Sequence, residues 1–290
     1  MLLSMKRRNY TKSTSLTIIG LIYALAVATG IIVFRLLTRG GTVPEILSLL
    51  AADVAATVIV WIFDLVFVNV SVYDPYWSVA PPVMFTALAV WKGVCTLPVI
   101  LLLIAIWYWG IRLTFNWFRS FKGLGHEDWR YTKYRESLPA ILFELTHFGG
   151  LVMMPTLIVF ACMVPGFKLY DAPSSGGWLT WTGFAMCIAA ATIQLVSDNQ
   201  SYRFRQANPG QVCNVGLWRH GRHPNYFGEI LIWWGVWVMY ASVFGIDWLI
   251  LSPTAMTALF LFISVPLMEH RQLKRKPGYA EYRKNTRVLI

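Results

Sequence analysis

The segment at residues 216–229 combines cationic, amide and carboxyl side chains and leads directly into an apolar run. Pro224 suits the first turn of a helix, so we expect a helix to begin there, with Asn225 and Glu229 four residues apart on one face. A helix N-terminus presents free backbone N–H groups, and the nearby Arg222 adds positive charge. These residue types in this order predict a site that binds an anionic group.

A second polar set precedes this segment. Gln194, Asp198, Tyr202 and Arg205 follow one another at intervals of four, four and three residues, so a continuous helix would place them along one face. This pattern is compatible either with a ligand-binding stripe or with an ordinary charged helix end. The tail 269–290 is likewise compatible with a binding contribution or with a basic flank of the last span. Its candidate residues are His270, Arg271, Tyr279, Tyr282 and Arg283.

Two carboxylates lie inside apolar runs, where an ionisable side chain usually marks a functional site. Counting about 1.5 Å per residue from the cytoplasmic end, Asp64 lies roughly 9 Å deep, Tyr108 roughly 15 Å and Asp53 roughly 25 Å. Asp64 is therefore the better partner for Tyr108 in proton chemistry. A structural ion pair between Asp64 and Arg112 is the alternative, and Trp109 fits a core or interface position.

The elements that must position these groups are membrane helices. Hydrophobic residues make up 57% of the chain, charged residues only 13%, and the mean hydropathy is +0.54. About 20 apolar residues span about 30 Å of hydrocarbon as a helix, and runs this long and unbroken exclude a barrel of alternating strands. We therefore predict an all-α, polytopic transmembrane bundle. Its predicted spans are 16–37, 46–70, 76–91, 94–118, 140–165, 177–196, 226–246 and 248–268.

The distribution of charge predicts the topology. With eight spans and both termini in the cytoplasm, the basic N-terminal tail lies inside and only Arg35, Arg39, Lys92 and Lys168 lie outside. Seven spans are the alternative, because the run 76–91 is short and contains two prolines. The net charge of +11 then favours contact with anionic lipid. Nucleic-acid binding is not expected, because no soluble domain remains to carry it, and the pattern indicates no metal site.

The chain resembles the steroid 5α-reductase C-terminal superfamily, and within it a largely uncharacterised multi-pass membrane branch. The resemblance covers roughly residues 70–290 and is centred on Arg222-His223-Pro224-Asn225-Tyr226. The branch shares three further motifs and a pattern in the tail. They are Trp109–Leu113, Glu127–Tyr131, Ser197-Asp198 and Glu269…Tyr279…Tyr282.

The resemblance implies an NADPH-dependent reductase acting on a carbon–carbon double bond conjugated to a ketone, in a steroid, isoprenoid or other lipid-soluble substrate. Tyr108 matches the tyrosine that polarises the ketone oxygen in the steroid reductases. Their glutamate has no clear counterpart, and Asp64 takes its place by depth alone. Gln194 stands where those reductases carry Asn, and Tyr202 where they carry Arg. The predicted cofactor-binding set is Gln194, Ser197, Asp198, Tyr202, Arg203, Arg205, Arg222, His223, Asn225, Tyr226, Glu229, His270, Arg271, Tyr279 and Tyr282.

Two other classes of function stay open. An S-adenosylmethionine-dependent methyltransferase of the isoprenylcysteine type shares an Arg-His-Pro-x-Tyr motif, but the several arginines here suit the phosphates of NADPH better. The other class is a non-catalytic membrane scaffold. Within one membrane domain, 1–290, we expect residues 1–135 to contribute to a lipid-substrate cavity and 136–290 to bind the cofactor. The expected location is the endoplasmic reticulum membrane of a eukaryote or the inner membrane of a bacterium, and the oligomeric state stays open.

Overall fold

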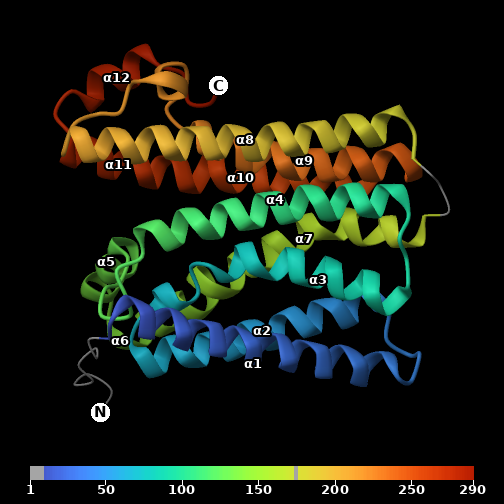
Figure 1. Cartoon of the computed structure of the whole chain (residues 1–290). Coiled ribbons are helices and arrows are strands. Elements are labelled where there is room, and N and C mark those ends of the chain that lie inside the picture. The colour runs from blue at the N-terminus through green and yellow to red at the C-terminus, as the bar shows by residue number, and fades with distance from the viewer. Residues whose placement is uncertain (1–9, 173–175) are drawn as a thin grey trace. The chain divides into compact units, whose positions relative to one another are not determined.

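Figure 1 shows the computed structural model of the chain, which describes residues 10–172 and 176–290. Most of the basic N-terminal tail used in the topology prediction lies outside the described residues. The described part is helical and contains no strand, only an isolated bridge between Gly221 and Arg287. The α-helices are α1 (Lys12–Thr38), α2 (Glu45–Phe67), α3 (Tyr76–Lys92), α4 (Leu97–Ser120), α5 (Trp129–Ser137), α6 (Ala140–Leu145), α7 (Met154–Lys168), α8 (Trp178–Ala207), α9 (Pro224–Phe244), α10 (Leu251–Leu259), α11 (Val265–Arg275) and α12 (Tyr279–Asn285). Shorter segments are the 3-10 turns η1 (Val70–Val72), η3 (Leu169–Asp171), η4 (Gly216–Arg219) and η5 (Trp248–Ile250), and the π-helical segments η2 (Thr146–Met153) and η6 (Phe260–Ser264).

Seven helical segments in the described part are long and apolar enough to cross a membrane. The prediction of an all-α polytopic protein is therefore confirmed. The run predicted as the short span 76–91 is helix α3, which has 17 residues with Pro81 and Pro82 inside it, and it is not among the seven. The orientation of the termini stays a prediction. The seven segments are Lys12–Thr38, Glu45–Phe67, Leu97–Ser120, Ala140–Asp171, Trp178–Ala207, Pro224–Phe244 and Trp248–Arg275.

The chain divides into two compact units that interleave along the sequence. Unit 1 consists of the residues up to Val83 together with 114–161, and unit 2 consists of 84–113 together with 162–290. The compact units therefore do not divide at a single point, as residues 1–135 and 136–290 would. The functional roles proposed for those two stretches stay predictions.

In unit 1 the turn after α2 is anchored by side chains from a later loop. Helix α2 closes on Val68, whose φ of +52° is unusual for a β-branched residue. The next residue, Asn69, donates from Nδ2 to the carbonyl of Leu124 at 2.7 Å. The buried Glu127 accepts the N–H of Val70 at 3.0 Å. The Glu127–Tyr131 motif therefore has a structural task, which is to hold the end of α2 in place.

A π-helical segment also shapes unit 1. Along α2, Thr57 and Asp64 are seven residues apart, close to two α-helical turns, so they share one face. Their hydrogen-bonding partners, Thr156 (3.2 Å) and His147 (3.2 Å), are nine residues apart, a spacing that would put them on opposite sides of a regular α-helix. Segment η2 includes His147, ends at Met153 before Thr156, and is wound more widely than an α-helix. Pro155, just beyond it, lacks the N–H that a regular helix would use, which favours such a distortion.

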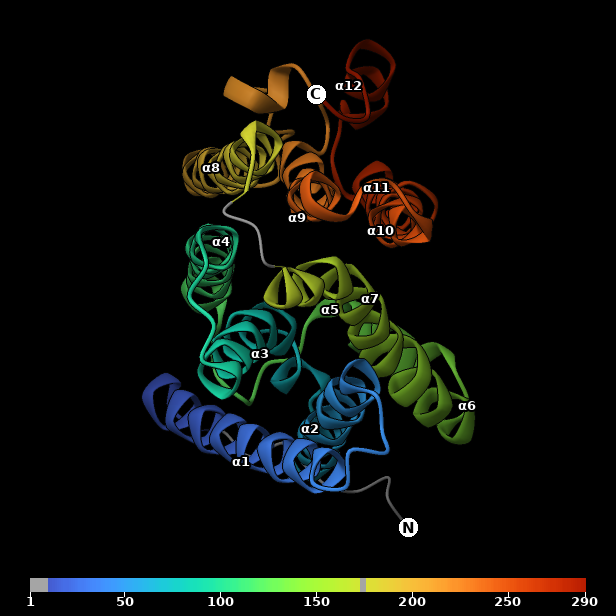
Figure 2. The ribbon, with the colours of Figure 1, turned by 90° about the vertical axis from the view of Figure 1, so that its right-hand side faces the viewer.

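In unit 2 the dominant packing is between α8 and α9. Figure 2 shows α9 between α8 and the α10–α11 segment. The closest approach uses glycines: a Cβ on Gly183 would lie 2.6 Å from the carbonyl oxygen of Gly235, and one on Gly228 would lie 2.7 Å from that of Ala190. No side chain could fit there without moving a backbone. This contact brings the polar end of α8 against the first turns of α9.

Candidate functional site

The centre of the candidate site in unit 2 is a buried arginine on α4. Arg112 donates from Nη1 to Asp198 at 3.0 Å and from Nη2 to the side-chain oxygen of Gln194 at 2.6 Å. Its side chain is 3% exposed and that of Asp198 is 11% exposed, so this is a buried ion pair. Helix α8 continues unbroken to Ala207, so Gln194, Asp198, Tyr202 and Arg205 lie on one continuous helix, as the predicted polar stripe requires. The arginine thus joins the first two residues of that stripe.

Glu229 forms the second half of this network. Its Oε2 accepts from Trp109 Nε1 at 2.9 Å and from Gln194 Nε2 at 2.7 Å, and its Oε1 accepts from Trp233 Nε1 at 3.1 Å. Trp109 was predicted as a core or interface aromatic, and it is fully buried, but it also orients a carboxylate. Because Gln194 bonds both Arg112 and Glu229, the network is continuous from α4 through α8 to α9.

Asn225 lies one turn before Glu229 on α9 and has an unsatisfied polar atom. The Asn225 backbone carbonyl accepts from Gln194 Nε2 at 3.2 Å. Its side-chain Oδ1 is buried and makes no hydrogen bond among the described residues. A buried acceptor without a donor costs free energy, so this atom is suited to accept from a bound ligand. Pro224 occupies the first helical turn, as predicted.

The turn before α9 is tied to the C-terminal segment. Arg222 pairs with Glu269 (Nε–Oε1, 2.7 Å) and donates to the backbone carbonyls of Arg283 (2.9 Å) and Thr286. The His223 ring lies parallel to that of Tyr226, with centroids 5.1 Å apart. Burial lowers the pKa of His223, while the neighbouring Glu269 opposes that shift. We had expected Arg222 to offer charge to an anion, but its guanidinium is directed to the tail.

Two tyrosines of the C-terminal tail, Tyr279 and Tyr282, lie in α12 close to the turn before α9. The hydroxyl of Tyr282 donates to the carbonyl of Trp218, and burial raises the pKa of that hydroxyl. Burial likewise raises the pKa of Tyr279 to about 12. At neutral pH both hydroxyls therefore stay protonated, and the Tyr279 ring lies against that of Tyr282 with centroids 5.7 Å apart. These residues fix the tail against the 216–223 turn.

A cluster of cations lies between the end of α8 and the turn after α11. Burial lowers the pKa of Lys276, and the positive charges of Arg205 and Arg271 lower it further, whereas Cys213 acts in the opposite direction. We refer to Arg205, Arg271 and Lys276 as the cation cluster. The sequence prediction included both arginines but missed Lys276. A lysine just after a helix is common as a membrane flank, and only its position before Pro277-Gly278, a turn, could have drawn attention to it.

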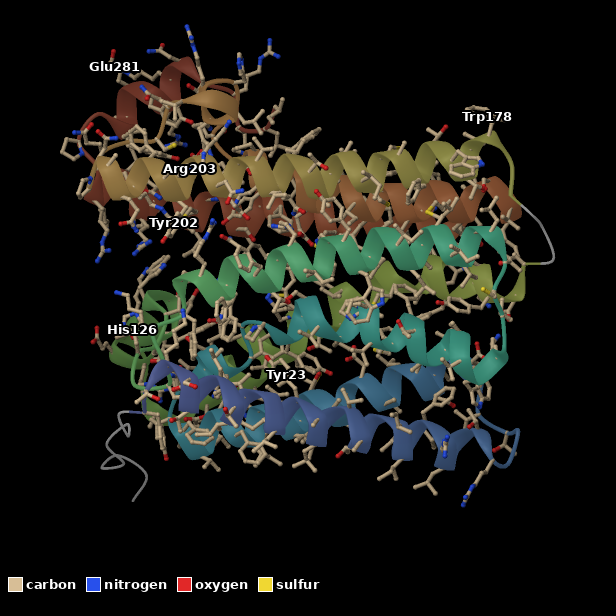
Figure 3. The ribbon with its side chains drawn as sticks, viewed as in Figure 1. Tyr23, His126, Trp178, Tyr202, Arg203 and Glu281 are labelled. Carbon is tan, nitrogen blue, oxygen red and sulfur yellow. The ribbon has the colours of Figure 1, made fainter. Side chains whose placement is uncertain are left out.

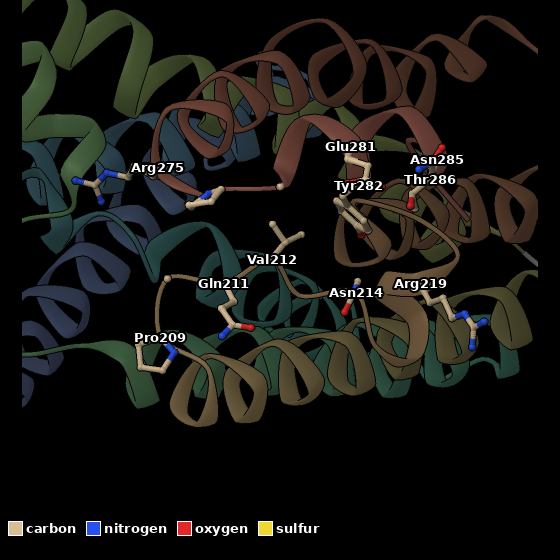
Figure 4. Close-up of a pocket in the computed structure, with 13 residues that line it drawn as sticks. Pro209, Gln211, Val212, Asn214, Arg219, Arg275, Glu281, Tyr282, Asn285 and Thr286 are labelled. Carbon is tan, nitrogen blue, oxygen red and sulfur yellow. The ribbon is translucent and has the colours of Figure 1, made fainter.

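A cavity of about 1170 Å³ opens at the same end of unit 2 (Figure 4). Of the predicted cofactor-binding residues, Tyr282 lines it. Arg219 and Arg275 add positive charge to its wall, and Glu281 adds negative charge. The buried network around Gln194 and Glu229 is not part of this wall.

The remaining predicted residues differ in their exposure. Figure 3 shows Tyr202 and Arg203 on the last turns of α8, at the end of unit 2 that carries α12. Arg203, Arg205 and His270 are exposed, and Tyr202 and Arg271 are half-buried. Ser197 is buried, and its hydroxyl donates to the carbonyl of Gln194 at 3.0 Å.

The two predicted catalytic residues lie in different units. Tyr108 of unit 2 is half-buried, and its hydroxyl lies 3.2 Å from that of Thr192. Asp64 of unit 1 is bonded to His147, so Asp64 and Arg112 each have a partner within their own unit. The pairing of Tyr108 with Asp64 in catalysis stays a prediction. Asp53, which was set aside, accepts from Tyr76 at 2.8 Å.

Comparison with known proteins gives a family match and one distant relative. Residues 60–286 match the family described as "Protein of unknown function (DUF1295)". A Schizosaccharomyces pombe protein, "Uncharacterized protein C594.04c", is 22% identical over 272 residues, which cover 83% of this chain and 78% of its own. No solved structure matches the chain. The family match spans every predicted catalytic and cofactor-binding residue, from Asp64 to Tyr282. Because the match covers most of the length of this chain, the chain belongs to the DUF1295 family.

Proposed function

We propose that this chain is an NADPH-dependent membrane reductase that reduces an enone-type carbon–carbon double bond of a steroid, isoprenoid or other lipid-soluble substrate. The observation that carries the proposal is the cation cluster. Arg205 comes from the end of α8, and Arg271 and Lys276 lie five residues apart at the end of α11. Burial lowers the pKa of Lys276, and the charges of the two arginines lower it further. Cations held together against their own repulsion are suited to bind a polyanion.

The charge of the ligand separates the candidate cofactors. NADPH carries a pyrophosphate and a 2′-phosphate, which together could neutralise three cations. S-adenosylmethionine carries one carboxylate and a positive sulfonium, so it offers the cluster much less. The family also belongs to a steroid 5α-reductase-like clan, which agrees with the resemblance of the 216–229 segment.

The buried network fits the other end of the same cofactor. The unbonded Oδ1 of Asn225 is suited to accept from the carboxamide N–H₂ group of a nicotinamide. Gln194, held by Arg112 and Glu229, keeps Asn225 in place through its backbone carbonyl. Bound NADPH supplies the hydride for such a reduction.

The protein contributes position and a proton donor. The hydroxyl of Tyr108 would donate a hydrogen bond to the ketone oxygen and stabilise the charge that develops there. Thr192, 3.2 Å away, orients that hydroxyl. The apolar helices around it would exclude water, which strengthens this hydrogen bond.

The proposal is tested by cofactor binding to the detergent-purified protein. Dissociation constants would be measured for NADPH, NADH and S-adenosylmethionine. We expect tight NADPH binding, which Lys276→Ala and Arg205→Ala each weaken about tenfold or more through the loss of a charge-assisted contact. Lys274→Ala, a change to an exposed lysine on the same helix as Arg271, is the matched control and should change binding less than about twofold.

Two further measurements assign the two ends of the ligand. NADPH affinity should fall as pH rises toward the lowered pKa of Lys276, and this dependence should disappear in Lys276→Ala. Asn225→Ala should weaken NADPH and NADH equally, because it acts away from the 2′-phosphate. Selective binding of S-adenosylmethionine would replace the reductase with a methyltransferase, and folded protein that binds neither cofactor would favour a scaffold.

A further inference from the structure

Unit 1 contains a buried chain of three titratable side chains that the proposed function does not use. His147 lies between two carboxylates: its Nε2 is 3.2 Å from Asp64 Oδ2, and its Nδ1 is 3.2 Å from Glu144 Oε2. The side chains of Asp64 and His147 are 0% and 1% exposed, whereas that of Glu144 is 43% exposed. The chain therefore has one end at the surface of the unit and one end inside it.

The number of hydrogen bonds fixes the number of protons in this chain. A neutral imidazole has one N–H, and ionised carboxylates only accept, so a neutral ring between two carboxylates satisfies one contact and leaves the other repulsive. Both contacts are hydrogen bonds only when the three groups share two protons. Two hydrogen bonds along this chain therefore require one proton more than a neutral histidine with two carboxylates.

The inner end of the chain has an atom with no hydrogen bond. Asp64 Oδ1 is buried and unbonded among the described residues. The N–H of Tyr73, which donates to the carbonyl of Val70 at 3.1 Å, also interacts with this carboxyl group. On the same helix, the indole N–H of Trp61 is also buried and unbonded, and its ring lies 6.5 Å from that of His147. An unused acceptor and an unused donor beside one ring point to a polar group, water or ligand, that binds here.

We propose that Glu144, His147 and Asp64 form a proton relay, which carries protons from the surface of unit 1 to a polar ligand group at the free oxygen of Asp64. Glu144 takes a proton from water and passes it to Nδ1 of His147, while the proton on Nε2 moves to Asp64 Oδ2. Rotation of the protonated carboxyl group then presents this proton to the ligand group. One proton enters and one leaves the ring, and no electrons are transferred. The ring returns to its starting form when its N–H is exchanged between the two nitrogens.

A proton taken from water needs a path into an apolar bundle, and the relay supplies one within unit 1. The charged and titratable groups that act on Asp64 from the elements packed around it are Tyr23 of α1, Tyr73 and Asp74 after η1, Glu127 of the loop and Arg135 of α5.

The relay is tested without any cofactor, by infrared spectroscopy of the purified protein. The C=O stretch of the protonated Asp64 carboxyl is identified by its loss in Asp64→Asn, and its rate of hydrogen–deuterium exchange is measured after transfer to D₂O. We expect Glu144→Gln and His147→Asn to slow this exchange at least tenfold. Exchange at Asp53, a buried carboxyl on the same helix that is bonded to Tyr76, should not change and serves as the internal control.

Either of two results would overturn the relay. One is that the Asp64 carboxyl shows no protonated band between pH 5 and 9, and the other is that both variants exchange as fast as the unmodified protein. Glu144 is half exposed, so Glu144→Gln should fold and keeps the test decisive even if a buried variant does not. Because no cofactor is added, failure of NADPH binding and failure of the relay are separate outcomes.

Discussion

Each unit of this protein contains a buried polar network, and the two networks differ in what their protons can do. In unit 2, indole and amide N–H groups donate to Glu229, and a guanidinium donates to Asp198. None of these donors releases a proton near neutral pH. In unit 1, Asp64 and Glu144 face an imidazole, which both accepts and donates.

The comparison indicates that the unit 2 network is suited to hold a bound molecule in position, whereas the unit 1 network is suited to transfer protons. A network of permanent donors fixes geometry, which suits the orientation of a bound molecule. A network of carboxyl and imidazole groups can change its protonation state, which suits proton transfer. Four predictions test this contrast, each by measuring the free energy or midpoint of unfolding in detergent micelles.

The largest effect should come from Arg112→Met. The change removes the guanidinium that donates to both Asp198 and Gln194. Loss of one partner of a buried ion pair costs about 3–5 kcal/mol. An Arg119→Met variant, whose arginine bonds Asn116 near the end of the same helix, is the control and should cost far less. Equal losses in both variants would show that the network is not fixed by this arginine.

A smaller but still clear effect is expected for Glu229→Gln. An amide presents N–H₂ on one side, so in either orientation it opposes at least one of the three N–H donors around position 229. We expect a loss of about 2–3 kcal/mol. Asp64→Asn should cost less than about 1 kcal/mol, because His147 can present either a donor or an acceptor to the new amide. A reversed order of these two losses would contradict the contrast between the networks.

Helix packing in the two units should also respond differently to added volume. In α8–α9 a Cβ at Gly235 would lie 2.5 Å from Cys187 Sγ and 2.8 Å from a backbone oxygen. Gly235→Ala should therefore destabilise by about 2 kcal/mol. In α1–α2 a Cβ at Gly30 would lie 3.2 Å from the carbonyl oxygen of Ala52, so Gly30→Ala should cost less. Gly20→Ala, with nothing within 4 Å, should be neutral or stabilising.

The smallest effect concerns the pH dependence of stability and Asp74, which lies in the turn between α2 and α3 of unit 1. Burial raises the pKa of Asp74 to about 6, against the charge of Arg130 and the hydrogen bond from Tyr131. A carboxyl whose pKa is raised on folding adds stability below its ordinary pKa of about 3.8, and this contribution is lost as pH rises through about 6. Between pH 5 and 8, Asp74→Asn should remove about 1 kcal/mol of this pH dependence. Asp128→Asn, which keeps an N-cap for α5, should not.

Sequence reasoning identified the elements and much of the unit 2 network, because helical spacing is a local property. The four-residue interval from Gln194 to Asp198 and the start of α9 at Pro224 follow from helix geometry and are present in the structure. Partners that are distant in the sequence were missed. Nothing in the sequence relates Asp64 to His147, which lies 83 residues later at the start of a π-helical segment.

Two residues were assigned from their type and not from their surroundings. Arg222 was expected to offer charge to a ligand, because an arginine in a motif resembles a phosphate ligand. Its guanidinium instead meets Glu269 and carbonyls of the tail. Trp109 was expected to be a core aromatic, because an indole in an apolar run is usually only that. Whether such a side chain also donates a hydrogen bond depends on a carboxylate 120 residues away.

The π-helical segment η2 allows a longer stretch of chain to fit between the same two contacts with α2. The partners of Thr57 and Asp64 are nine residues apart where seven would match a regular helix, so η2 absorbs two surplus residues. A related chain that is two residues shorter between positions 147 and 156 would keep both contacts on an ordinary α-helix. A chain shorter by one residue would rotate one of the two partners away from α2. Alignments of related sequences through this region should therefore place gaps of two residues, not one.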